Sequence, residues 1–239
     1  MNIDKGSMHL FNKETSISDC SGAKMDLIFV LDTSTSVTEP NFKLMIDFLK
    51  FFLVVANVDD DNVRVGIVIY STKVFIQFHM DEYIGNKRGL YRALDEIPYA
   101  YGSTNTFGGL NTMRTQMFLR ERGDRPDVEN VCILITDGVS NINARKTVPE
   151  AVKARDQNIH IYVIGIGLTD TREIDGIASK PVEENRFTVQ EFSELQVMRQ
   201  KVFGSICSKY EQLLNDMFIS EPTLKLHVFV LYFKVILSV

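Results

Sequence analysis

The sequence predicts a doubly wound α/β fold, with a mostly parallel sheet, helices on both of its faces and one antiparallel edge strand. Short apolar runs alternate along the chain with longer segments of helical periodicity, which is typical of strands connected by helical crossovers. Two of the apolar runs, residues 25–32 and 129–137, end in an aspartate. The 239 residues are 45% hydrophobic and 24% charged, so the chain can build a substantial core.

The first strand is predicted at residues 25–32, where "MDLIFVLD" forms an apolar run that suits burial on both faces of a sheet. Residues 39–58 are longer than an ordinary strand and carry Pro40 near their start, so they predict a deeply packed helix. The next two runs, residues 62–71 and 73–80, predict an antiparallel hairpin. Two further helices are expected at residues 86–97 and 106–121.

The second half of the chain continues the alternation. Residues 129–137, "ENVCILITD", predict another buried strand, in which Cys132 is a buried free thiol. The remaining elements are expected as a helix at 149–158, a strand at 159–167, a short helix at 171–180, a weak strand at 186–189 and a helix at 190–208. In this last helix the apolar residues recur at helical spacing; they are Phe192, Leu195, Met198, Val202, Phe203 and Ile206.

Composition excludes several function classes. A net charge of −5 without any basic block argues against a nucleic-acid-binding surface. Four histidines and three cysteines without a CxxC pair leave little material for a histidine or zinc site. The apolar end of the chain, residues 223–239, is interrupted by two lysines and a histidine and is shorter than the roughly 20 residues of a spanning helix. We therefore expect a β-prone or non-native tail there, not a membrane anchor.

Oxygen-bearing side chains follow the predicted strands at one end of the sheet. Asp32 ends the first strand and is followed by Ser34 and Ser36, Thr104 and Thr106 lie in the loop "YGSTNTFGG" at a helix entrance, and Asp137 ends another strand. Ligands of open α/β sheets collect at the carboxyl ends of the strands, so these side chains are expected at one rim. Such an all-oxygen set suits Mg²⁺, Mn²⁺ or Ca²⁺ better than zinc. Taken singly, Ser34, Ser36 or Thr38 could instead cap the following helix, and Asp137 could be a turn residue.

The segments "DTSTS", "GSTNTFGGL" and "ILITDGVSN" resemble, in order and spacing, the metal-ion-dependent adhesion site of the von Willebrand factor A domain. The resemblance covers about residues 20–207 and assigns Asp32, Ser34, Ser36, Thr104 and Asp137 as metal ligands, with Mg²⁺ as the expected ion. It implies that hydroxyls take the inner positions and that the two aspartates act through water or as alternates. A cation held by neutral donors keeps much of its charge, so it favours one further carboxylate, presented by a partner protein.

The resemblance also implies a compartment. Cys20 and Cys207 bracket the predicted domain, as in matrilins and the A domains of type VI collagen, and a disulfide between them is expected at the end of the sheet opposite the metal rim. We therefore expect an extracellular module that binds matrix or cell-surface proteins, flanked by tails at 1–19 and 208–239. The first nineteen residues contain no secretory signal, so the N-terminus is expected to be incomplete or cut from a longer chain.

Two other interpretations remain open from the sequence. One is an intracellular A domain that serves as a scaffold. The other is a metal-dependent hydrolase, although no predicted rim segment carries a histidine that could act as a base. The tripeptide Arg122-Gly123-Asp124 is interpreted as a chance feature of a polar loop, and the acidic run at 58–62 as a solvated turn without the spacing of a calcium loop.

Overall fold

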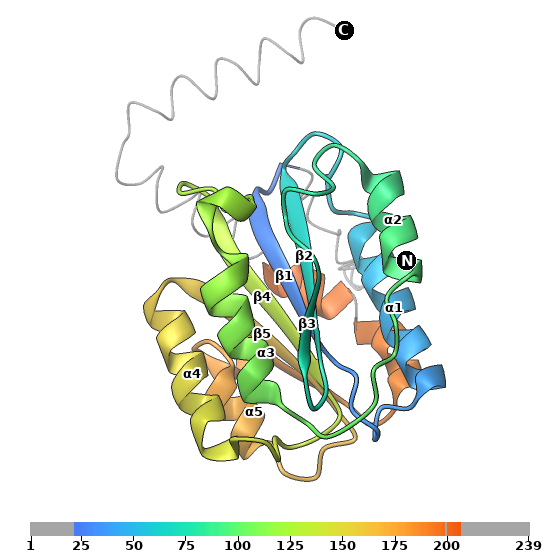
Figure 1. Cartoon of the computed structure of the whole chain (residues 1–239), viewed down its shortest axis with the longest axis vertical. Helices are drawn as coiled ribbons and strands as arrows, with labels where there is room; N and C mark the ends of the chain where they lie inside the picture. The colour runs from blue at the N-terminus through green and yellow to red at the C-terminus, as the bar shows by residue number, and fades with distance from the viewer. Residues whose placement is uncertain (1–21, 199, 207–239) are drawn as a thin grey trace, which may run out of the picture.

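The computed structural model describes residues 22–198 and 200–206 (Figure 1). Its strands are β1 (Met25–Asp32), β2 (Val63–Tyr70), β3 (Val74–Phe78), β4 (Glu129–Thr136), β5 (Ile159–Ile166) and β6 (Arg186–Val189). Its α-helices are α1 (Glu39–Leu53), α2 (Lys87–Asp95), α3 (Thr106–Thr112), α4 (Ala144–Asp156), α5 (Arg172–Ile177) and α6 (Val182–Asn185), and a further helix covers residues 195–198 and 200–206.

The strands form a six-stranded sheet in the order β3-β2-β1-β4-β5-β6. All neighbouring pairs are parallel except β2 and β3, which are antiparallel and place β3 at one edge. The predicted α/β fold with one antiparallel edge strand is therefore confirmed. After β1 the chain first builds one side of the sheet and later returns to pair β4 on the other side of β1. This topological switch point between β1 and β4 is where α/β sheets open a crevice for ligands.

Both faces of the sheet are buried. In β1, Leu27, Phe29 and Leu31 pack with α1, α2 and the last described helix, whereas Ile28 and Val30 pack with α3, α4 and α5. All five side chains have 0% of their surface exposed. Figure 1 shows these two helical layers on opposite sides of the sheet. The continuous apolar run of β1 therefore follows from burial on both faces.

Several helices differ from their predicted limits, among them the last, which was predicted from residue 190 but begins at 195 after a 3-10 turn at Phe192–Glu194. The first was predicted to reach residue 58 but ends at Leu53, because the chain turns there and buries Ala56 and Val58 while Val54 is 58% exposed. The helix predicted at 106–121 is α-helical only to Thr112 and continues as a π-turn to Met117.

The helix predicted to begin at Pro149 begins five residues earlier, at Ala144, with Pro149 inside it. Proline normally ends a helical pattern because it lacks an N–H group. Here it lies in the second turn of α4, and its missing N–H removes one i→i−4 hydrogen bond from the helix.

The apolar stripe of the last helix packs into the core as predicted. Leu195, Val202 and Ile206 are buried, and Met198 is half-buried against the same cluster. Cys132 is a buried free thiol, also as predicted. Cys20, Cys207 and both predicted tails lie outside the described residues. Within the described part of the chain, no helix is long and apolar enough to cross a membrane.

Candidate metal site

The adjacent carboxyl ends of β1 and β4 hold a buried carboxylate. Asp32 is the last residue of β1, has no exposed surface and lies beside Thr136, the last residue of β4. The Thr136 hydroxyl donates a 2.7 Å hydrogen bond to Asp32 Oδ2, and the backbone N–H of Ser34 donates a 2.8 Å bond to Oδ1. Both oxygens of Asp32 are therefore fixed in orientation.

A chain of hydroxyls leads from this carboxylate to the surface. Ser34 is buried and its Oγ lies 3.1 Å from the Oγ of Ser36, which is exposed. The Ser36 hydroxyl in turn donates a 2.8 Å hydrogen bond to Asp137 Oδ1. Four of the five predicted ligands thus form one connected cluster: Asp32, Ser34, Ser36 and Asp137.

The fifth predicted ligand, Thr104, is held beside this cluster through the β4–α4 loop. Its backbone N–H donates a 3.0 Å hydrogen bond to Asn141 Oδ1, and its carbonyl accepts bonds from the N–H groups of Asn141 and Ile142. A side chain starting at Gly138 would lie 3.8 Å from Thr104 Oγ1. The Thr104 hydroxyl therefore adjoins the residue after Asp137.

Burial affects the ionisation of both aspartates of the site. Burial raises the pKa of Asp32 to about 6, and the nearby Asp137 carboxylate adds to the increase, while hydrogen bonds from Ser34 and Thr136 oppose it. Burial also raises the pKa of Asp137. A cation would relieve both shifts by stabilising the ionised carboxylates.

The donor set fits a hard cation. Every candidate ligand offers a hydroxyl or carboxylate oxygen, with no nitrogen or sulfur atom. The described residues include no group of three or more His, Cys, Asp or Glu side chains that could hold a metal. The residues that could hold a cation at this rim are Ser34, Ser36 and Thr104 together with the two aspartates, whose oxygens are the atoms that hard divalent ions prefer.

Comparison with known proteins identifies the family. Residues 26–201 match the sequence model of the von Willebrand factor type A domain. The chain belongs to this family.

The relatives of this A domain include matrix proteins that are much longer. It is 28% identical over 215 residues to the collagen alpha-4(VI) chain of Mus musculus, covering 89% of this chain and 9% of the relative. It is 30% identical over 206 residues to matrilin-1 of Gallus gallus, covering 85% of this chain and 41% of the relative.

A solved structure shows the same fold. Proximal thread matrix protein 1 from the mussel byssus, in a structure with zinc in its metal-ion-dependent adhesion site (MIDAS) motif, matches with a TM-score of 0.72 and 26% identity. The match covers 77% of this chain and 48% of that protein.

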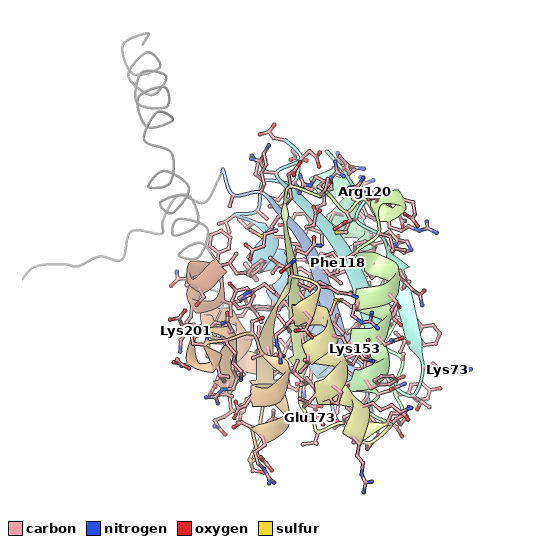
Figure 2. The ribbon with its side chains drawn as sticks, turned by 90° about the vertical axis from the view of Figure 1, so that its left-hand side faces the viewer. Lys73, Phe118, Arg120, Lys153, Glu173 and Lys201 are labelled. Atoms are coloured by element: carbon pink, nitrogen blue, oxygen red, sulfur yellow. The ribbon has the colours of Figure 1, made fainter. Side chains whose placement is uncertain are left out.

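Several residues of the A-domain rim were not predicted from the sequence. Thr136 orients Asp32, Asn141 positions Thr104, and the Tyr99 hydroxyl donates a 3.0 Å hydrogen bond to the carbonyl of Ser34. Glu173 of α5 accepts a 2.8 Å bond from the N–H of Ser140, and burial raises the pKa of this glutamate. Figure 2 shows Glu173 and Lys73 at the rim end of the molecule and Arg120 at the other end.

The Arg122-Gly123-Asp124 tripeptide is part of the structural framework. Gly123 is buried with φ 96°, and a Cβ there would lie 2.8 Å from the backbone nitrogen of Asp81. Its carbonyl accepts a 2.9 Å hydrogen bond from Arg64, and the Oδ1 atom of Asp124 is buried. This geometry favours the structural interpretation of the tripeptide.

Proposed function

We propose that this A domain is a non-enzymatic protein-binding module. In this proposal it holds a divalent cation, Mg²⁺ or alternatively Mn²⁺ or Ca²⁺, and binds an acidic residue of an extracellular partner through it. The observation that carries the proposal is the connected cluster of Asp32, Ser34, Ser36 and Asp137, with Thr104 beside it.

The chemistry of the cluster supports recognition of a carboxylate. Three of the five side chains are neutral hydroxyls, so a bound divalent ion would keep part of its charge. The cluster also reaches the surface at Ser36, which is exposed. A carboxylate from another protein could complete the coordination there, because oxygen anions are the preferred ligands of hard cations.

The positions of the histidines support a non-enzymatic role. His79 follows the edge strand β3 and His160 lies near the start of β5, so both described histidines are at the end of the sheet opposite the rim. The rim therefore offers a base only in its own carboxylates, whereas a hydrolase would need a separate general base. The matrix proteins among the relatives also favour adhesion over catalysis.

An extracellular location is proposed on the same relatives and on the predicted Cys20–Cys207 disulfide. Mass spectrometry of peptides from the non-reduced protein tests it. A cross-linked pair containing Cys20 and Cys207 is expected for an oxidising compartment. Two free thiols at these positions would favour the intracellular scaffold instead.

A pull-down from matrix extract tests the proposed function. The immobilised chain is incubated with extract in Mg²⁺, and bound proteins are eluted with EDTA. The Thr104→Ala variant should lose these proteins, whereas Ser103→Ala, which removes a neighbouring exposed hydroxyl outside the cluster, should retain them. An identical set of proteins bound in Mg²⁺ and in EDTA would contradict cation-dependent binding.

A further inference from the structure

Tyr101 is anchored next to the hydroxyl cluster. Its neighbour Gly102 makes two hydrogen bonds with Thr35, one from the N–H of Thr35 at 2.9 Å and one to its Oγ1 at 3.0 Å. Thr35 lies between the two serines of the cluster. The loop that carries Tyr101 is therefore fixed to the loop that carries Ser34 and Ser36.

The side chain of Tyr101 contributes little to the fold. It is 70% exposed, and its ring centroid lies 6.3 Å from that of Tyr99. Its backbone has φ 25°, in the left-handed region that costs free energy for any residue except glycine. The next residue, Gly102, has φ 128° and no room for a Cβ, which would lie 2.5 Å from Thr72 Oγ1. The fold thus requires glycine at 102, but nothing in it requires an aromatic side chain at 101.

A second exposed apolar side chain lies on the loop after β4, which supplies Asp137. Val139 is 52% exposed and follows Asp137 by two residues. Gly138 between them adjoins Thr104 Oγ1. Apolar groups thus project from two of the three loops that supply the candidate ligands. Exposed apolar surface beside polar groups is typical of a protein-binding site.

We infer that the partner residue bound at this rim is a glutamate or aspartate with an aromatic or large aliphatic residue close to it in its own sequence. This inference rests on the proposed function and specifies the partner. The carboxylate completes the cation's coordination, and the neighbouring apolar side chain packs on Tyr101 and Val139. Buried aromatic residues are the usual anchors of protein interfaces, so Tyr101 is the main determinant of the apolar preference.

Selection from a phage-displayed library of random heptapeptides tests the inference. The library is bound to the chain in Mg²⁺ and eluted with EDTA, using wild type, Tyr101→Ala and, as a control, Phe51→Ala. Phe51 is 46% exposed near the end of α1, away from the rim. Wild type and Phe51→Ala should enrich acidic residues flanked by aromatic or aliphatic ones, whereas Tyr101→Ala should enrich acidic residues with a reduced flank preference.

The best wild-type peptide is then titrated into all three proteins. We expect its affinity to fall about tenfold or more in Tyr101→Ala, the effect of losing one well-buried aromatic contact, with Mg²⁺ affinity unchanged. The inference would be overturned if the wild-type protein selected acidic peptides without aromatic or aliphatic residues beside the acid, or if Tyr101→Ala selected such residues as strongly as wild type. Either result would leave the proposed function standing. Peptides without acidic residues, or binding that persists in EDTA, would overturn the proposed function as well.

Discussion

The Ser36 hydroxyl donates a hydrogen bond to Asp137 Oδ1 across 101 positions of sequence. This contact joins the loop after β1 to the end of β4, on either side of the topological switch point. The two loops are therefore joined by a direct hydrogen bond between their side chains. Binding of a cation should stabilise the fold, because a ligand that binds only the native state shifts the unfolding equilibrium.

The first prediction concerns this stabilisation. At a Mg²⁺ concentration of about 100 times Kd, the free energy of unfolding should rise by about 2.7 kcal/mol, which raises Tm by several degrees for a domain of this size. Ser36→Ala should lose most of the increase, because it removes one candidate ligand and the contact to Asp137. Differential scanning calorimetry with and without Mg²⁺ measures the effect.

Ser103→Ala is the matched control for this measurement. Ser103 is exposed and adjacent to Thr104 in the chain, and its backbone N–H, which alanine retains, donates a hydrogen bond to Thr72 Oγ1. Its Mg²⁺-dependent rise in Tm should equal that of wild type. Equal rises in Ser36→Ala and wild type would argue against Ser36 as a ligand. The same scans with Mn²⁺, Ca²⁺ and Zn²⁺ rank the ions by the rise in Tm that each produces.

The second prediction concerns pH. The pKa of Asp32 is about 6 in the folded chain, above its ordinary value of 3.8, so the folded state binds this proton more tightly than the unfolded state. Its contribution to stability is fully present below about pH 4 and is lost as pH rises through 6; it amounts to about 3 kcal/mol. Urea unfolding in EDTA between pH 4 and pH 7.5 should show this loss in wild type.

Asp32→Asn isolates this contribution from the other acidic groups. The variant cannot ionise at this position, so the difference between its stability and that of wild type should change across pH 4–6 and then level off. In Mg²⁺ the loss in wild type should be smaller above pH 6, because the cation stabilises the ionised carboxylate. Parallel pH curves for the two proteins in EDTA would contradict the assigned shift.

The third prediction concerns the loop before β4. The backbone N–H and Nε of Arg125 donate to the two oxygens of Asp26 at 2.6 and 2.8 Å, and its guanidinium also binds the backbone carbonyls of Met25, Asp61 and Asn62. Asp26 is fully buried. Arg125→Ala should therefore lower the free energy of unfolding by about 3–5 kcal/mol, because the buried carboxylate loses its charged partner and keeps only the bond from the backbone N–H of residue 125. Urea unfolding measures the loss.

A double variant distinguishes an unpaired charge from lost packing. Arg125→Met combined with Asp26→Asn removes both charges, so it should be clearly more stable than Arg125→Met alone, which keeps the same packing at position 125 but leaves the Asp26 charge unpaired. The exposed pair Arg172 and Asp170 supplies the control, and Arg172→Ala should leave the urea midpoint unchanged. A urea midpoint for Arg125→Ala equal to that of wild type would mean that Arg125 does not stabilise the fold through Asp26.

The strands and the candidate ligands could be predicted because both follow from local patterns. The apolar run that ends in Asp32 marks β1 to the residue, and the strand ends predict that Asp32 and Asp137 share one rim. The selection of Thr104 as a candidate ligand came from the resemblance to the A-domain motif. Side-chain contacts between loops leave no such pattern. Thr136, Asn141 and Tyr99 were not predicted, since threonine, asparagine and tyrosine in a loop or strand end have many possible partners.

Helix limits were less predictable for a related reason. Residues 54–58 are apolar enough to continue α1, but the direction of the chain after Leu53 depends on how the turn packs. The expectation that proline marks a helix boundary is also wrong at α4, because Pro149 lies inside this helix. Its missing N–H removes one hydrogen bond of the helix, in the second turn. The end of α1 and the start of α4 therefore depend on tertiary packing, which the sequence pattern does not encode.

The last prediction concerns the backbone at Tyr101. At ordinary helical positions alanine is more stable than glycine by about 1 kcal/mol, but at positive φ the order should reverse, because only glycine adopts that region without strain. With φ 25° at residue 101, Tyr101→Gly should be more stable than Tyr101→Ala by about 1 kcal/mol in urea unfolding. Val152, inside α4 and 39% exposed, supplies the control pair, in which alanine should be the more stable. The same order at both positions would mean that residue 101 relaxes out of the left-handed region, and the anchoring of Tyr101 by Gly102 and Thr35 would then be weaker than the two hydrogen bonds indicate.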